Sequence, residues 1–252
     1  MKKKMRSVAL VGLLLGISIS ASAGPVVTVF YEENGQVELI SSKGTRVLID
    51  VYRPTRLSSP ATKDDILLTT HTHPDHVNWD FLAGFKGQQL FAKTGEITTG
   101  DVAIKGLAAA HNEGDLLLQE NGTNYIFVVL MDGFRIAHLG DIGQPALTEE
   151  QLAELGKVDL AVMQFDNRYS EIDSTNRKGF SVMAQLNPRL IIPTHNSAIA
   201  VEYEGTLWPC FYTEKPSIKL RREILTDETR LIFIGKLALG YAEYSGATRV
   251  EW

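Results

Sequence analysis

The hydrophobic positions of the chain fall into many short runs, and most of these runs have the composition of β-strands. The runs are rich in β-branched, aromatic and aliphatic residues, and turn-forming residues separate one run from the next. They predict strands at residues 26–31, 37–40, 46–51, 66–70, 102–107, 124–130, 134–138, 160–165, 190–193 and 231–234. This pattern is typical of a protein that is rich in β-sheet.

Three segments between these runs have helical character, at residues 77–84, 148–155 and 174–186. The second starts with Thr148-Glu-Glu-Gln151, which is the spacing of a capping box, and Pro188 ends the third. The sequence therefore predicts a mixed α/β organisation.

Two turns are predicted near the N-terminus. Asn34-Gly35 is a hairpin signal, and residues 42–45 form a second turn, so the first strands should form an antiparallel meander. Neither a repeat nor a long linker interrupts residues 24–252, which we therefore expect to form one domain.

Residues 1–23 have the pattern of a signal peptide. Four basic residues lie between positions 2 and 6, an apolar stretch follows at residues 8–19, and Ala21-Ser22-Ala23 is a small-residue cleavage site. The apolar stretch is shorter than the roughly 20 residues that a membrane-spanning helix needs. We therefore expect cleavage before Gly24 and a periplasmic or secreted protein without a stable membrane anchor. An uncleaved signal anchor is the alternative.

Removal of residues 1–23 would leave 229 residues and, because four positive charges go with them, would change the net charge from −5 to −9. An acidic surface repels nucleic-acid backbones, so we expect a small-molecule substrate and no nucleic-acid partner. Cys210 is the single cysteine and has no second cysteine for an internal disulfide. Core packing must therefore stabilise the fold.

The strongest chemical signal is His71-Thr-His73-Pro-Asp75-His76, directly after the predicted strand at residues 66–70. In extended backbone His71 and His73 point to the same side, and the turn at Pro74 redirects Asp75 and His76 to a neighbouring position. Two adjacent ligand pairs indicate two adjacent metal ions. Imidazoles and carboxylates, in place of the cysteines of many structural zinc sites, indicate a catalytic site open to water.

This motif resembles the first motif of the metallo-β-lactamase superfamily, and His111, Asp141 and His195 follow in the order of that family's later ligands. The resemblance covers residues 26–236 and implies an αββα sandwich of two mixed sheets flanked by helices. It also implies a first metal held by His71, His73 and His111, a second held by Asp75, His76 and His195, and Asp141 as the bridge. Zinc is the first expectation for both divalent ions, with manganese or iron as alternatives.

The resemblance further implies hydrolysis by a hydroxide that bridges the two ions, with Asp75 as the catalytic residue that orients it and accepts its proton. His138-Leu-Gly-Asp141 and Ile192-Pro-Thr-His195 are most similar to the branch that contains ascorbate 6-phosphate lactonase. Esters, lactones and phosphodiesters are thus the candidate substrates. Cys210 comes after His195, out of order for the cysteine ligand of the commonest antibiotic-degrading members.

Other functions remain open: a β-lactam or nucleic-acid hydrolase of the same superfamily, a diiron protein of the same fold, or a non-catalytic metal-loaded binding domain. Arg168 and Asn196 are candidate substrate contacts, Arg168 because guanidinium groups pair with carboxylates and phosphates. For His138 we favour a structural role over direct ligation.

Overall fold

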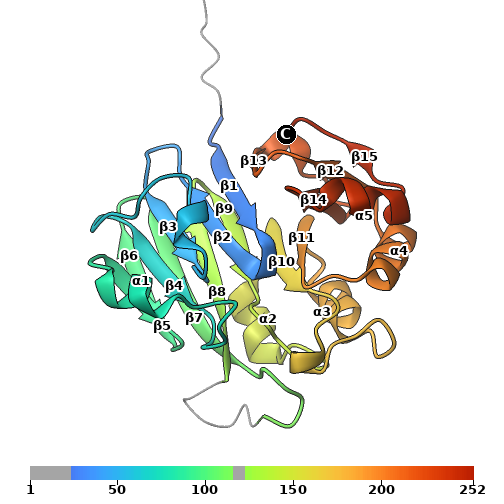
Figure 1. The fold of residues 1–252 in the computed structure, drawn as a ribbon, viewed down its shortest axis with the longest axis horizontal. Coiled ribbons are helices and arrows are strands. Elements are labelled where there is room, and N and C mark those ends of the chain that lie inside the picture. The colour runs from blue at the N-terminus through green and yellow to red at the C-terminus, as the bar shows by residue number, and fades with distance from the viewer. Residues whose placement is uncertain (1–23, 116–122) are drawn as a thin grey trace, which may run out of the picture.

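Two β-sheets form the centre of the computed structural model, which describes residues 24–115 and 123–252 (Figure 1). In strand order, the first sheet consists of β13 (Ser217–Leu220), β1 (Val27–Glu32), β2 (Gln36–Ile40), β3 (Arg46–Ile49), β4 (Ile66–Thr69) and β5 (Gln88–Phe91). The second consists of β15 (Thr248–Arg249), β12 (Cys210–Thr213), β14 (Arg230–Ile234), β11 (Leu190–Thr194), β10 (Leu160–Gln164), β9 (Phe134–His138), β8 (Asn124–Met131), β7 (Val102–Ala109) and β6 (Gly95–Thr99). The proposed signal segment, residues 1–23, lies outside the described residues.

The first sheet begins as the predicted meander, because β1, β2 and β3 pair antiparallel. The short 3-10 turn η1 (Glu33–Gly35) joins β1 to β2, with Asn34 at φ 61° and Gly35 at φ 88°. These left-handed conformations suit asparagine and glycine, which explains the hairpin signal. β4 and β5 then add to β3 in parallel.

The second sheet is antiparallel from β6 to β9 and parallel from β9 through β10, β11 and β14 to β12. Loops that follow neighbouring parallel strands leave the sheet at the same edge. Asp141, Asn167 and His195 are therefore brought to one edge, since they follow β9, β10 and β11.

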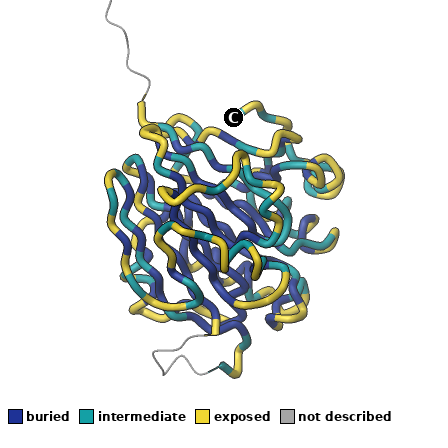
Figure 2. The backbone as a smooth tube through the Cα atoms, turned by 60° about the vertical axis from the view of Figure 1, so that its left-hand side comes forward, coloured by how far each residue is buried: buried dark blue, intermediate teal, exposed yellow. Residues whose placement is uncertain are grey.

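Three apolar clusters divide the molecule into layers. The largest joins the inner faces of both sheets, and Val29, Leu68, Phe127 and Ile192 are among its members. The second cluster packs the outer face of the nine-stranded sheet against α2 (Glu149–Leu155), α3 (Lys178–Leu186), α4 (Ala198–Leu207) and α5 (Ala238–Ser245), and the third packs α1 (Trp79–Gly84) on the other sheet. Buried backbone accordingly runs through the middle of the molecule (Figure 2). These layers confirm the predicted αββα sandwich.

All ten predicted strands are present, with ends that differ by at most two residues, and so are the three predicted helices. The capping box forms as predicted, since Thr148 accepts from the Gln151 backbone and the Gln151 side chain accepts from the Thr148 backbone. The third helix starts at Lys178 and not at residue 174. Asp173 explains the shift, because its side chain accepts hydrogen bonds from the backbones of Thr175 and Asn176 and holds a turn there.

Helices α4 and α5 were not predicted, and neither were the short strands β5, β6, β12, β13 and β15. In α4 the charged residue Glu204 lies on the buried face, which obscures the hydrophobic period of the helix. Among residues 24–115 and 123–252, the helices do not combine the length and apolar character that crossing a membrane requires.

Candidate metal centre

The histidine-rich motif forms a tight turn at the end of β4. Backbone N–H groups of His76 and Val77 donate to the His73 carbonyl over 3.0 and 3.1 Å, so the chain coils immediately after Pro74. His71 and His76 are buried, His73 is exposed, and Asp75 keeps 41% of its side chain exposed. One short segment thus supplies both buried and accessible polar groups.

The other candidate ligands come from three loops that follow strands of the second sheet. His111 follows β7, and its backbone N–H donates to the Thr123 hydroxyl over 2.9 Å. Asp141 follows β9, and its N–H donates to Asn124 Oδ1 over 3.0 Å. His195 follows β11 with φ 42°, a left-handed conformation that turns the chain toward α4.

The structure brings all seven predicted ligands together in two adjacent groups. One group is His71, His73, His111 and Asp141, the other is Asp75, His76 and His195, and within each group the candidate ligand atoms lie within 4.8 Å of one another. Asp141 lies between the groups, because its Oδ1 is 3.4 Å from His76 Nε2 and 3.3 Å from His195 Nε2, while Oδ2 is 3.7 Å from His71 Nε2. Each group could hold a metal ion, and Asp141 lies where it can reach both groups.

The polar atoms of the cluster fit metal ions well. Among the described residues, the buried atoms His71 Nε2, His111 Nε2 and Asp141 Oδ1 have no hydrogen-bond partner. Buried polar atoms without a partner cost free energy, and these three all point into the cluster that could hold a metal. The donor set of imidazoles and carboxylates suits zinc, and also manganese or iron.

Asp50, which the sequence analysis did not single out, holds two parts of the motif in place. It is fully buried at the end of β3, with φ 52°. Its carboxylate accepts from the Thr70 backbone and the Thr70 hydroxyl, each over 2.7 Å, and lies 2.9 Å from His76 Nδ1. Asp50 therefore orients His76 with Nε2 toward Asp141. In the sequence, the position of Asp50 directly after an apolar strand was the signal that could have indicated this role.

Asn167 and Gly140 position the shared carboxylate. Asn167 is buried and donates from Nδ2 to Asp141 Oδ2 over 2.7 Å. Gly140 has φ +57°, and a Cβ there would collide with the side chains of Asn124 and Thr70. Glycine is therefore required at this close approach.

Both ring nitrogens of His138 make hydrogen bonds to backbone groups outside the seven candidate ligands, which together are called the metal cluster here. Nε2 lies 2.7 Å from the Gly35 carbonyl, and Nδ1 accepts from the Gly140 N–H over 3.1 Å. These contacts agree with a structural role, since they tie η1 to the loop that carries Asp141.

Charge in the cluster is unevenly distributed between the histidines. Burial and the neighbouring His76 lower the pKa of His71 to about 3, and burial also lowers the pKa of His111. Burial would lower the pKa of His76 too, but Asp141 and Asp50 raise it to about 10. In the absence of metal, His76 therefore carries the proton and the charge, while His71 and His111 are neutral.

We expect metal binding to displace the proton of His76. Metal affinity should therefore rise about tenfold per pH unit while the pH stays below the His76 pKa.

Without metal, the charged His76 stabilises the fold fully below the ordinary histidine pKa of about 6.5, and this stabilisation is lost as the pH rises to about 10. Competition with a chelator between pH 6.5 and 9, and thermal unfolding of the metal-free protein over the same range, measure the two effects. An affinity independent of pH would contradict the first.

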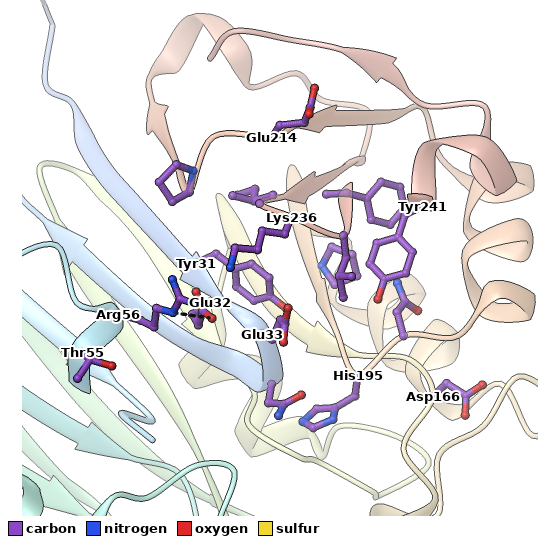
Figure 3. A pocket seen from close by; sticks show the side chains of 18 residues that line it. Tyr31, Glu32, Glu33, Thr55, Arg56, Asp166, His195, Glu214, Lys236 and Tyr241 are labelled. Atoms are coloured by element: carbon purple, nitrogen blue, oxygen red, sulfur yellow. Dashed lines mark ion pairs between the residues drawn. The ribbon is translucent and has the colours of Figure 1, made fainter. Parts of the chain in front are cut away.

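A cavity of about 700 Å³ lies beside the metal cluster and reaches it at His195 (Figure 3). Tyr31, Asp166, Asn196 and Tyr241 line it, and contact of Asn196 with substrate stays a prediction. A second, smaller cavity of about 200 Å³ reaches His73 and His111 from another side. Arg168 is exposed on the 3-10 turn η3 (Arg168–Ser170) and is not among the residues lining either cavity. Its contact with substrate stays a prediction.

Glu204 is a fully buried acid of α4, and the Asn196 amide donates to both its carboxylate oxygens over 2.9 and 3.1 Å. Burial raises the Glu204 pKa well above 4.5, although the hydrogen bond from Asn196 opposes the shift. The folded protein thus retains a proton that the unfolded chain releases, so Glu204 costs stability as the pH rises above the unfolded pKa.

Replacement of Glu204 by glutamine should therefore stabilise the protein at pH 8, by about 1 kcal/mol or 2–4 °C in Tm, and by less at pH 5. The glutamine oxygen can still accept from Asn196. Thermal unfolding at both pH values tests this, with Glu202→Gln on the exposed side of the same helix as the control. Equal effects of Glu204→Gln at both pH values would show that titration of Glu204 is not the cause.

Comparison with known proteins agrees with this geometry. Residues 37–195, more than half of the chain, match the family model of the β-lactamase superfamily domain. The chain belongs to the metallo-β-lactamase superfamily. All seven candidate ligands lie within the matched residues 37–195. Among curated proteins, none matches it in sequence.

Solved structures share the fold of this metallo-β-lactamase superfamily protein. A candidate zinc-dependent hydrolase of the superfamily from Thermotoga maritima is 21% identical with a TM-score of 0.62, and the match covers 83% of this chain and 100% of that one. A candidate metal-dependent hydrolase from Parabacteroides distasonis is 16% identical with a TM-score of 0.53, covering 82% and 93%. The metallo-β-lactamase fold protein YhfI from Bacillus subtilis is 12% identical with a TM-score of 0.52, covering 84% and 97%. At these identities the likeness concerns the fold.

Proposed function

We propose that this protein is a hydrolase that uses two divalent metal ions, first of all zinc, to cleave an ester, lactone or phosphodiester of a small molecule. The observation that carries the proposal is the pair of ligand groups on either side of Asp141, next to an open cavity. His71, His73 and His111 would hold one ion, Asp75, His76 and His195 the other, and Asp141 both. When bound, such a pair lowers the pKa of a shared water toward about 7 and polarises the group under attack.

The protein's own groups are prepared for this chemistry. The lowered pKa values of His71 and His111 keep their nitrogens unprotonated and available as ligands. Although burial raises the pKa of Asp141, His76 and His195 hold it well below its usual value, so Asp141 carries a negative charge between the two groups. A charged carboxylate between two ligand groups is suited to binding both ions.

Asp75 is the half-exposed acid of the cluster, with Oδ2 4.0 Å from His76 Nε2. Its exposure leaves a carboxylate oxygen free to orient a water molecule and to accept its proton. We therefore propose Asp75 as the proton acceptor.

Similarity of two short motifs to the lactonase branch makes esters and lactones the first substrates to test, and the superfamily's phosphodiesterases make phosphodiesters the second. Metal content by plasma mass spectrometry should be measured together with hydrolysis of chromogenic esters, lactones, bis(4-nitrophenyl) phosphate and a chromogenic β-lactam. We expect about two ions per chain and turnover of an ester, lactone or phosphodiester. His73→Ala should lose both, whereas Thr72→Ala, at the exposed position between His71 and His73, should retain both.

Protein that cannot be loaded with metal would overturn the proposed mechanism. Metal-loaded protein that cleaves none of these substrates would favour the non-catalytic binding domain, and cleavage of the β-lactam alone would favour that substrate class.

A further inference from the structure

The cavity beside His195 has a wall that lies outside the family match. Phe233, Lys236 and Tyr241 contribute to this wall from the end of β14, the following loop and α5, and Tyr31 faces them from β1. In the view of Figure 3 the Lys236 side chain runs in the direction of Tyr31, and His195 lies at the opposite end of the lining. A ligand that fills the cavity would therefore contact aromatic rings, a lysine and the metal cluster at the same time.

The loop that carries Lys236 has a defined conformation. Gly235 has φ +91°, its N–H donates to the Thr213 carbonyl over 2.9 Å, and its carbonyl accepts from the Ala238 N–H over 3.2 Å. These backbone bonds fix the start of the Lys236 side chain at the cavity wall, although the side chain itself is exposed.

The acidic residues that line the cavity each have a partner already. These partners are Arg53 at 3.2 Å and Arg56 at 3.9 Å for Glu32, Arg53 at 3.4 Å for Glu33, Arg249 at 3.5 Å for Glu214, and the Ser197 hydroxyl for Asp166. Arg56 also lines the cavity, but Glu32 shares its charge, as the dashed line in Figure 3 marks. Among the described residues, Lys236 is the charged group of this wall that has no ion pair or hydrogen bond.

We propose that the substrate carries an anionic group, a carboxylate or a phosphate, on an apolar body, and that Lys236 binds this group while the bond to be cleaved lies at the metal cluster. The inference rests on the proposed function for the position of the cleaved bond, but not for the binding of the anion. Lysine pairs with either anion as a point charge, and Tyr31, Phe233 and Tyr241 contact the apolar body.

Three anilides that the enzyme is not expected to cleave test the binding directly. N-Phenylpentanamide is neutral, glutaric acid monoanilide carries a carboxylate at the far end, and its phosphonate analogue carries a phosphate-like group there. Isothermal titration calorimetry should show about tenfold tighter binding of an anionic form than of the neutral one. Whichever anion binds more tightly identifies the group. The preference should persist after a chelator removes metal, because Lys236 and not the metal provides it.

Lys236→Met should reduce the preference to less than about twofold, and Lys236→Arg should retain most of it. Lys86→Met is the matched control, since Lys86 is an exposed lysine after α1 that does not line the cavity. In the metal-loaded protein, Lys236→Met should raise the KM for mono-4-nitrophenyl glutarate about tenfold. The KM for the neutral ester 4-nitrophenyl pentanoate should not change.

Equal binding of neutral and anionic anilides by the wild type would overturn the inference, as would a preference that survives Lys236→Met. Binding results of the expected kind in a protein that hydrolyses no ester, lactone or phosphodiester would contradict the proposed function and leave the anion site supported. Ester hydrolysis without any preference for the anionic anilides would support the proposed function and contradict the anion site.

Discussion

Replacement of Asp141 by alanine is expected to abolish binding of at least one metal ion and to lower hydrolysis by about a thousandfold or more. Asp141 is 2% exposed, and its two oxygens lie between the histidines of both ligand groups. Loss of this negative charge would leave the positive ions without their shared ligand. Metal ions in such sites contribute several kcal/mol to transition-state stabilisation, and each 1.36 kcal/mol corresponds to a factor of ten in rate.

Metal content and hydrolysis should be measured on the same samples, with circular dichroism to confirm folding. Asp141→Asn keeps an oxygen that can accept from Asn167, so it separates loss of charge from loss of packing. Asp227→Ala removes a carboxylate whose side chain is 92% exposed and should change neither quantity. Full metal content and activity in Asp141→Ala would show that Asp141 does not join the two groups.

The grouping of the candidate ligands could be predicted because they follow strands in a spacing that fixes their directions. His71 and His73 have the two-residue period of extended chain, and Pro74 forces the turn that redirects Asp75 and His76. His111, Asp141 and His195 could be assigned from the family resemblance alone, because nothing local indicates that strands far apart in sequence end at one edge. The structure brings all of them to that edge.

The residues that support the ligands were harder to find in the sequence. Asp50 contacts His76 from 26 residues away, and Asn167 contacts Asp141 from 26 residues away. Asp50 is a single polar residue after an apolar strand, and Asn167 is one of three consecutive polar residues, so a turn is the ordinary interpretation of both. Which polar residue faces the cluster depends on the packing of the two sheets against each other, and that packing is not visible in local patterns.

The C-terminal wall of the cavity beside His195 was also not predicted. The family match ends at residue 195, whereas Phe233, Lys236 and Tyr241 lie in the C-terminal part built from α4, α5 and β12 to β15. These elements are short, and their hydrophobic periods are weak. Under the proposal above, the metal chemistry and the selection of the substrate come from different parts of the chain, so membership of the superfamily indicates the reaction more directly than the substrate.

Replacement of Asp50 by alanine is expected to destabilise the protein by about 3–5 kcal/mol and to weaken metal binding by about 10–100-fold. Three buried groups would lose their acceptor: the Thr70 N–H, the Thr70 hydroxyl and His76 Nδ1. His76 would no longer be held with Nε2 toward Asp141. Asp50→Asn should have a smaller effect on stability, because its amide oxygen still accepts and asparagine tolerates the left-handed backbone at this position.

Denaturant unfolding of the metal-free variants and chelator competition of the loaded ones measure the two effects. Asp132→Ala is a suitable control for backbone strain, since Asp132 has the same φ of 52° but makes exposed hydrogen bonds.

The stability of wild type and Asp50→Ala at low pH provides a further test. Burial raises the Asp50 pKa, but His76, His138 and His71 together lower it further, so the net pKa lies below the usual value and the stabilisation by Asp50 is lost as the pH falls below about 4. The difference in stability between wild type and Asp50→Ala should therefore shrink in acid, and a difference that stays constant would show that the Asp50 charge is not its source.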